Sequence, residues 1–201
     1  MGKTFSGFRK ETKEHLLIDA GLFLKNFKYE ANSDIVAAIE AAKTAGNVLG
    51  ATKGGGEFSA VATIRQIEVD GVKGRAKGLE VIDSWEVYLK ATVLEATCET
   101  IKAALCAATV DTETDTTYDI ISGKSSIDDE DYLDNITWVG NLSGSDKPVI
   151  IQVYNALNTD GLKLTVQDKN EATIPMTFYG HYTQDDLDTP PFDIYYPKKK
   201  A

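Results

Sequence analysis

The chain repeatedly alternates apolar and polar residues, and this pattern restricts its fold more than any other feature. In the longest example, residues 84–94, the apolar positions are Trp85, Val87, Leu89, Ala91 and Val93. Because successive side chains of a strand point to opposite faces, such a run predicts a strand with one buried face. Shorter runs of the same kind are centred on Ile151, Leu164 and Met176. The chain is therefore expected to be rich in half-buried strands.

A turn signal and a change of phase lie just before the longest run. Asp70-Gly71 separates two strand-like runs, and this dipeptide is a strong signal for a tight hairpin turn. In residues 62–69 the alternation changes phase between Ile64 and Ile67. A β-bulge explains such a change, and so does a strand that is covered on both faces.

Two segments have the features of short helices. Thr97 is placed to cap a helix whose apolar stripe contains Cys98, Ile101, Leu105 and Ala108. Ser33 or Asp34 is placed to cap a second helix near residues 34–45. The pattern as a whole predicts a mainly β protein, an antiparallel β-sandwich or barrel with one flanking α-helix and the short helix near residues 34–45.

The length of 201 residues is that of a single domain, residues 1–201. Within it we expect an N-terminal arm (about residues 1–15), an extended loop region (about 31–60) and a C-terminal tail (about 183–201). No stretch approaches the roughly 18 consecutive apolar residues of a membrane span. The N-terminus also lacks the apolar segment of a secretory signal. We therefore expect a protein that is made and folded in cytoplasm and has no membrane partner.

The charge is negative overall and unevenly distributed. A net charge of −10 argues against a protein that grips DNA, because lysine and arginine drive phosphate binding. Residues 111–146 contain ten acidic residues and one lysine, whereas residues 1–30 have a small excess of cations. Segments of opposite sign on one chain suit head-to-tail contact between copies, and they are equally compatible with solvated surfaces.

Three features invite a chemical interpretation, and none has the required spacing. In the run Lys53–Gly56 the lysine precedes the glycines and a strand follows, whereas a phosphate-binding loop needs the reverse order and a helix. The acidic run 128–134 lacks the glycine and the alternating ligands of a calcium loop. His15 and His181 lie in unrelated segments. We therefore expect no catalytic residue, no metal site and no cofactor in this chain. The protein is expected not to be an enzyme.

Four stretches together resemble the major tail tube proteins of long-tailed bacteriophages. They are LIDAGLFLKNFK at residues 17–28, LGATKGGGEF at 49–58, IEVDGVKGRAKGLEVIDSWE at 67–86 and TPPFDIYYP at 189–197. These are loose patterns whose specificity comes from their correct order over most of the chain. Residues 31–46 look more helical than a long loop between rings, and the acidic stretch 111–135 has no clear counterpart in the family.

The resemblance implies a β-sandwich with a flanking helix, assembled as hexameric rings that stack into the tail tube. In such a tube the sheets join around a lumen through which phage DNA passes without specific binding. The implied partners are other copies of the chain, a tape-measure protein, a tail terminator and distal tail or baseplate proteins. The implied location is the virion tail, after synthesis in the cytoplasm of the bacterial host.

Ring-to-ring contact is assigned to the N-terminal arm, the 31–60 region and the C-terminal tail, since a glycine-rich loop needs a neighbour to order it. The contact candidates are Lys53, Gly54, Gly55, Gly56 and Phe58. The lumen is expected to be negative or neutral, lined by outward-facing strand positions. The lumen candidates are Glu68, Glu80 and Glu86.

Two other classes compete with the tail tube. One is a β-sandwich that serves as a host-adhesion or receptor-binding module of a phage tail. Such a module exposes an aromatic patch, for which Tyr195-Tyr196 or Tyr179 with Tyr182 are available. The other class is a small hydrolase on a β scaffold, which no motif in the sequence supports.

Overall fold

A computed structural model describes residues 6–198 of the chain, and within them the protein is mainly β, with 45% strand and 12% helix. This described part contains ten strands, two α-helices and two short 3-10 helices, Thr12–Glu14 before the first strand and Asp129–Asp131 between the fifth and sixth strands. The strands are β1 Leu17–Lys25, β2 Thr52–Gln66, β3 Glu80–Val93, β4 Ala108–Asp111, β5 Ile120–Gly123, β6 Leu133–Leu142, β7 Val149–Asn158, β8 Thr165–Gln167, β9 Asn170–Tyr179 and β10 Phe192–Tyr195. The helices are α1 Ile35–Thr44 and α2 Cys98–Ala104.

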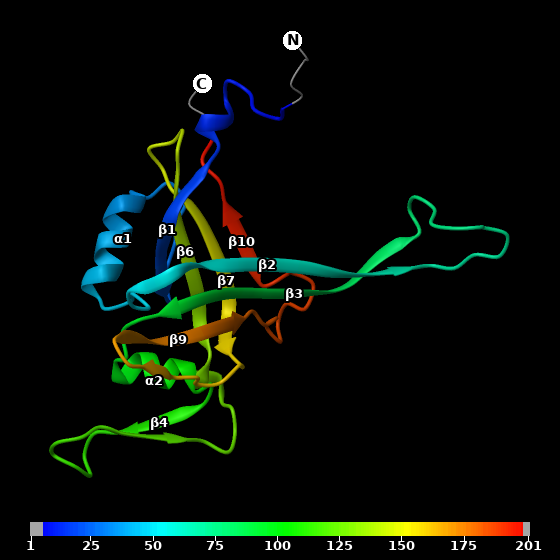
Figure 1. The fold of residues 1–201 in the computed structure, drawn as a ribbon. Helices are drawn as coiled ribbons and strands as arrows, with labels where there is room; N and C mark the ends of the chain where they lie inside the picture. Colours follow the sequence, from blue (N-terminus) through cyan, green and yellow to red (C-terminus); the bar gives the residue numbers. More distant parts are fainter. Residues whose placement is uncertain (1–5, 199–201) are drawn as a thin grey trace.

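The main sheet is antiparallel and folds over on itself. Its strand order is β1-β6-β7-β9-β3-β2, with β10 added to β7 and β8 added to β9. Figure 1 shows that β2, β3 and β9 run across the direction of β1, β6 and β7, so the strands of the two halves of the sheet cross. β7 connects the halves, because its end at Leu157 and Asn158 pairs with β9.

The apolar core fills the space between these two halves. The inward positions of β3 supply Val87, Leu89, Ala91 and Val93, as the alternation predicts. They pack with Ile174, Met176 and Phe178 of β9 and with Phe23, Ile136 and Val153 from the other half.

The two helices have different positions. Asp34 caps α1 by accepting hydrogen bonds from the backbone N–H groups of Val36 and Ala37, which confirms the predicted short helix. α1 covers the outer face of the β1–β6–β7 half through Ile35, Ala42 and their neighbours. α2, capped by Thr97, lies at the open end of the core, where Ala104 is fully buried. The structure thus has the predicted flanking helix and a second helix that also has a packing role.

Three predictions about loops need correction. Residues 31–60 are not an extended loop, because they contain α1 and the first half of β2. Part of the predicted C-terminal tail, Phe192–Tyr195, is a strand paired with β7. Asp70-Gly71 is not a two-residue turn between strands, since it lies within a loop that spans residues 67–79. Lys198 is the last residue that the structure describes, so the lysine-rich end of the predicted tail falls outside the described residues.

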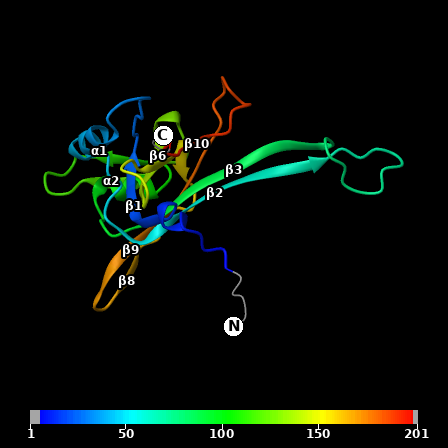
Figure 2. The same cartoon turned by 90° about the horizontal axis from the view of Figure 1, so that it is seen from above.

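Two hairpins project from the body. The longer is formed by the distal parts of β2 and β3 with their connecting loop, and both views show it standing clear of the remaining elements (Figures 1 and 2). We call residues 61–85 the arm. The shorter is the separate two-stranded sheet of β4 and β5, which lies beyond α2 at another end of the molecule (Figure 1).

Candidate interaction surface

A β-bulge in the arm determines which of its side chains lie on the same face of the sheet as the apolar core. Thr63 pairs with Ser84, but the next residue of β2, Ile64, pairs with Ile82. Asp83 is therefore an extra residue in β3, and its carboxylate accepts a hydrogen bond from the Nε of Arg65 at 3.0 Å. The bulge lies in β3 and leaves the alternation of β2 unbroken, whereas the change of phase seen in the sequence falls at Ile67, one residue beyond the end of β2.

The bulge decides which side chains share a face. Without it, Ile82 would alternate onto the same face as Glu86, away from the core. With it, Ile82 and Ile64 follow Trp85 on the face that is continuous with Val87 and the core. The core face of the sheet thus extends into a region where, within the described residues, no second layer covers it.

The arm exposes much apolar surface for its size. Ile64 and Ile82 are 59% and 53% exposed although they lie on the core-side face. The other exposed apolar side chains of the arm are Val61, Ile67, Val69, Val72 and Val81. Burying one such side chain fully is worth about 1.5–3 kcal/mol, so a surface that covered several of them would gain a substantial free energy. Such a concentration of apolar side chains marks a candidate interaction surface.

The loop of the arm carries three cations, which follow Glu68 and Asp70, in a protein whose net charge is −10. Lys73, Arg75 and Lys77 lie at every second position of the loop. Arg75 approaches Glu80, with Nη1 and Oε1 3.9 Å apart, whereas Lys73 and Lys77 have no ion pair among residues 6–198. A side-chain bond from the Nε2 of Gln66 to the carbonyl of Gly74, at 3.0 Å, holds the loop to the end of β2.

All three predicted lumen residues belong to the arm or its base, but they do not share one face. Glu86 lies opposite Val61 on the outward face of β3, as expected. Glu80 lies opposite Gln66 on the other face, because the bulge separates it from Glu86. Glu68 lies in the loop, outside any strand. Only Glu86 therefore has the outward-facing strand position that the sequence predicts.

The predicted contact residues are part of β2 rather than of a free loop; they are Lys53, Gly54, Gly55, Gly56 and Phe58. Gly54 and Gly55 have positive φ angles of 85° and 75° in an irregularity between Thr52 and Gly56. At Gly56 a β-carbon would lie 2.4 Å from both the ring of Phe23 and the carbonyl oxygen of Lys90.

The side chains on either side of the glycines are engaged within the protein. Lys53 forms a 3.0 Å ion pair with Glu171 at the start of β9. Phe58 packs on the core and against Phe192, with ring centroids 5.8 Å apart. The glycines therefore permit a bulge and a close approach of β1, a long-range requirement that the sequence alone does not show.

The tyrosines proposed for an adhesion surface are spread over the molecule. Tyr195 packs on Tyr29 with ring centroids 4.4 Å apart, and Tyr179 packs on Tyr88 at 5.7 Å. The hydroxyl of Tyr182 accepts a hydrogen bond from the backbone N–H of Trp85.

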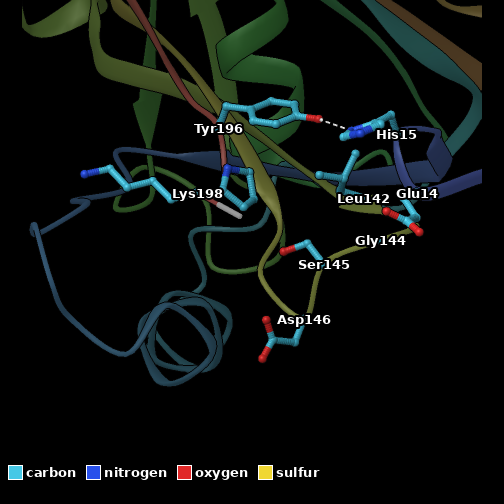
Figure 3. Close-up of a pocket in the computed structure, with 9 residues that line it drawn as sticks. Glu14, His15, Leu142, Gly144, Ser145, Asp146, Tyr196 and Lys198 are labelled. Carbon is cyan, nitrogen blue, oxygen red and sulfur yellow. Dashed lines mark hydrogen bonds between the residues drawn. The ribbon is translucent and has the colours of Figure 1, made fainter. Parts of the chain in front are cut away.

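Tyr196 lies in a pocket of about 240 Å³ between the two ends of the described chain. Figure 3 shows the Tyr196 hydroxyl pointing at His15, and Ser145 and Asp146 of the β6–β7 connection lie below this pair in the view. The hydroxyl oxygen is 3.4 Å from Nδ1 of His15. Ser143 in the same connection accepts a hydrogen bond from the backbone N–H of Leu16. These contacts fasten the segment before β1 to the body.

One ion pair in the acidic region is largely buried. Lys124 lies 2.6 Å from carboxylate oxygens of both Asp128 and Asp131, and the side chain of Asp131 is only 4% exposed. Hydrogen bonds from the backbone N–H of Asp128 and from Lys124 hold the pKa of the Asp131 carboxyl below its usual range. The two carboxylates raise the pKa of Lys124. This part of the acidic stretch therefore has a structural role in holding the chain between β5 and β6.

Comparison with known proteins yields no match, either to a protein-family model or to a curated sequence. Among residues 6–198 no group of three His, Cys, Asp or Glu side chains is arranged to hold a metal ion. No helix in this part of the chain is long and apolar enough to cross a membrane.

Proposed function

We propose that the protein is a structural subunit that assembles with copies of itself, as stacked hexameric rings, into the tail tube of a long-tailed bacteriophage. Two observations support this function: the resemblance of the sequence to tail tube proteins, and the exposed apolar face of the arm. In this proposal, the folded-over antiparallel sheet is the β-sandwich of the tube subunit, and DNA passes through the lumen during ejection.

The observation that carries the proposal is the exposure of Ile64 and Ile82 on a face continuous with the core. Apolar side chains that lie exposed on the core-side face of a long hairpin are typical of a surface that another molecule covers. Contact between copies supplies that cover in every ring of the tube.

The sheet edges support the same proposal. β1 and β2 are the two ends of the main strand path among the described residues. Residues 47–49 hydrogen-bond to the outer edge of β1 only at its C-terminal part, through Phe23 and Lys25, so most of that edge has no strand beside it. Open edges favour strand pairing with another chain, and a ring closes them by a repeated head-to-tail interface. The excess of acidic residues suits a lumen that must not hold phosphates.

Within this proposal, the tape-measure protein, the tail terminator and the distal tail proteins are the further partners. The virion tail is the place of function. Glu86 remains a lumen candidate on its outward strand position. Lys53, Gly54 and Gly55 remain candidates for contact between rings, and of these Lys53 and Gly54 are exposed.

The test is to shorten the arm without disturbing the body. Because Thr63 and Ser84 are direct partners, residues 64–83 can be replaced by an Asn-Gly turn that closes the hairpin. We expect the wild-type protein to form large particles in light scattering as its concentration rises. The shortened protein is expected to stay monomeric and to remain folded, with a β-type circular dichroism spectrum and a cooperative unfolding transition. A wild-type protein that remains monomeric at every concentration overturns the proposal.

A further inference from the structure

The β4–β5 hairpin has the opposite charge to the tip of the arm. Its segment 108–123 contains four acidic residues and no lysine or arginine. These residues are Asp111, Glu113, Asp115 and Asp119. All four lie on the exposed hairpin that projects beyond α2 (Figure 1).

The charges of the two hairpins have the same spacing. Lys73, Arg75 and Lys77 on the arm lie two residues apart, as do the acidic residues at 111, 113 and 115. Both runs lie mainly in the loops that connect the strands of their hairpins. Each loop therefore carries several charges of one sign close together at a projecting end of the molecule.

Both hairpins also expose apolar side chains beside their charges. Tyr118 and Ile120 are exposed on the β4–β5 hairpin, with Tyr118 at 71%. Val72 is exposed on the loop of the arm, beside Lys73. Contact between the hairpins would therefore bury apolar surface together with opposite charges, and this combination is typical of specific interfaces.

Two of the four carboxylates already support the local turn. Asp111 accepts hydrogen bonds from the backbone N–H groups of Glu113 and Thr114, and Asp115 accepts them from Thr117 and Tyr118. Glu113 and Asp119 have no ion pair among the described residues. They are the side chains free to meet the cations of another molecule.

We propose that the tip of the arm of one copy binds the β4–β5 hairpin of a second copy, through Lys73 and Lys77 on one side and Glu113 and Asp119 on the other. This inference rests on the proposed self-assembly and names the acceptor of the arm. The two hairpins leave the body at different ends (Figure 1), so the contact joins different copies and repeats head to tail.

Charge reversal tests the pairing. A tip variant carries Lys73→Glu and Lys77→Glu, and a hairpin variant carries Glu113→Lys and Asp119→Lys. Each alone places like charges at the contact and is expected to raise the concentration for half-maximal assembly by about tenfold or more. A mixture of the two variants restores opposite charges at every contact and is expected to assemble like the wild-type protein.

A matched control variant, Lys147→Glu with Lys163→Glu, changes the net charge as much as the tip variant at exposed lysines of the body. It is expected to assemble normally. Raising the salt concentration from about 0.05 M to about 1 M, where the Debye length falls to about 3 Å, should weaken wild-type assembly and narrow its difference from the single variants.

The outcomes separate the two proposals. If the wild-type protein assembles and the tip variant assembles equally well, the pairing of the hairpins is wrong and the tail-tube proposal stands. If each variant fails and their mixture also fails, the two charged segments do not meet each other, and the pairing is again wrong. If the wild-type protein never assembles, both proposals are overturned.

Discussion

Ile64 and Ile82 lie directly opposite each other across the β2–β3 hairpin, and each is more than half exposed to solvent. The bulge at Asp83 puts them on the face that, nearer the body, packs into the core. An apolar pair in this position contributes little to the stability of a single copy. Its contribution is expected in the contact between copies.

Replacing both residues by serine therefore separates assembly from folding. We expect the Ile64→Ser, Ile82→Ser variant to unfold within about 2 °C of the wild-type midpoint, because exposed substitutions change stability by about 0.5 kcal/mol or less. Its assembly, followed by light scattering, should be lost. Leu187→Ser, at an exposed leucine outside the arm, is the control and should assemble normally. Normal assembly of the double variant would contradict a role for this face.

A second prediction concerns Gly56. A methyl group there would meet the Phe23 ring and a backbone oxygen at 2.4 Å, so Gly56→Ala is expected to destabilise the protein by about 1–3 kcal/mol or more. Gly74→Ala has open space and no positive φ, and should have little effect. Urea unfolding of the two variants measures the difference. Equal stability would show that Phe23 does not pack on Gly56.

A third prediction concerns acid stability. The folded pKa of Asp131 lies below its unfolded value of about 3.9, so its contribution is complete above that pH and is lost as the pH falls towards the folded pKa. Asp131→Asn should lower the free energy of unfolding at pH 7 by about 1–3 kcal/mol, because it breaks a partly buried, charged hydrogen bond. The difference from wild type should shrink below about pH 4.

Denaturant unfolding across this pH range provides the measurement, with Asp129→Asn as an exposed control. A deficit that is the same at pH 3 and pH 7 would mean that the charge of Asp131 does not stabilise the fold.

A fourth prediction concerns Asn158, which joins α2 to the sheet. Its side chain donates to the carbonyl of Ala104 at 2.7 Å and accepts from the backbone N–H of Thr177 at 3.1 Å, and the residue is buried. Asn158→Leu leaves both backbone groups without this partner and should cost about 2–4 kcal/mol. Hydrogen exchange at α2 should speed up more than at α1, since α1 packs on the opposite side of the sheet. Equal acceleration at both helices would argue against a local effect.

The sequence predicts well those elements whose signals are local. The buried face of β3 follows from alternation alone, and α1 follows from a capping aspartate before an apolar stripe. The mainly antiparallel β class follows from the number of such runs and the small number of helices.

The features that the sequence misses depend on distant residues. Alternation in 61–64 looks the same whether the apolar face meets a second layer or solvent, so the arm is not distinguishable from a core strand. The glycines at 54–56 suggest a loop, and only the position of Phe23 shows why Gly56 lies in a strand. β10 is four residues long, too short for its pattern to separate it from the surrounding tail.

Electron microscopy of the purified protein at high concentration examines self-assembly itself. We expect hollow tubes of stacked rings with sixfold symmetry, in which the arm of each copy, including Ile64 and Ile82, lies against a neighbouring copy. Particles that remain single copies at every concentration and salt condition, or assemblies in which the arm projects freely into solvent, would contradict it.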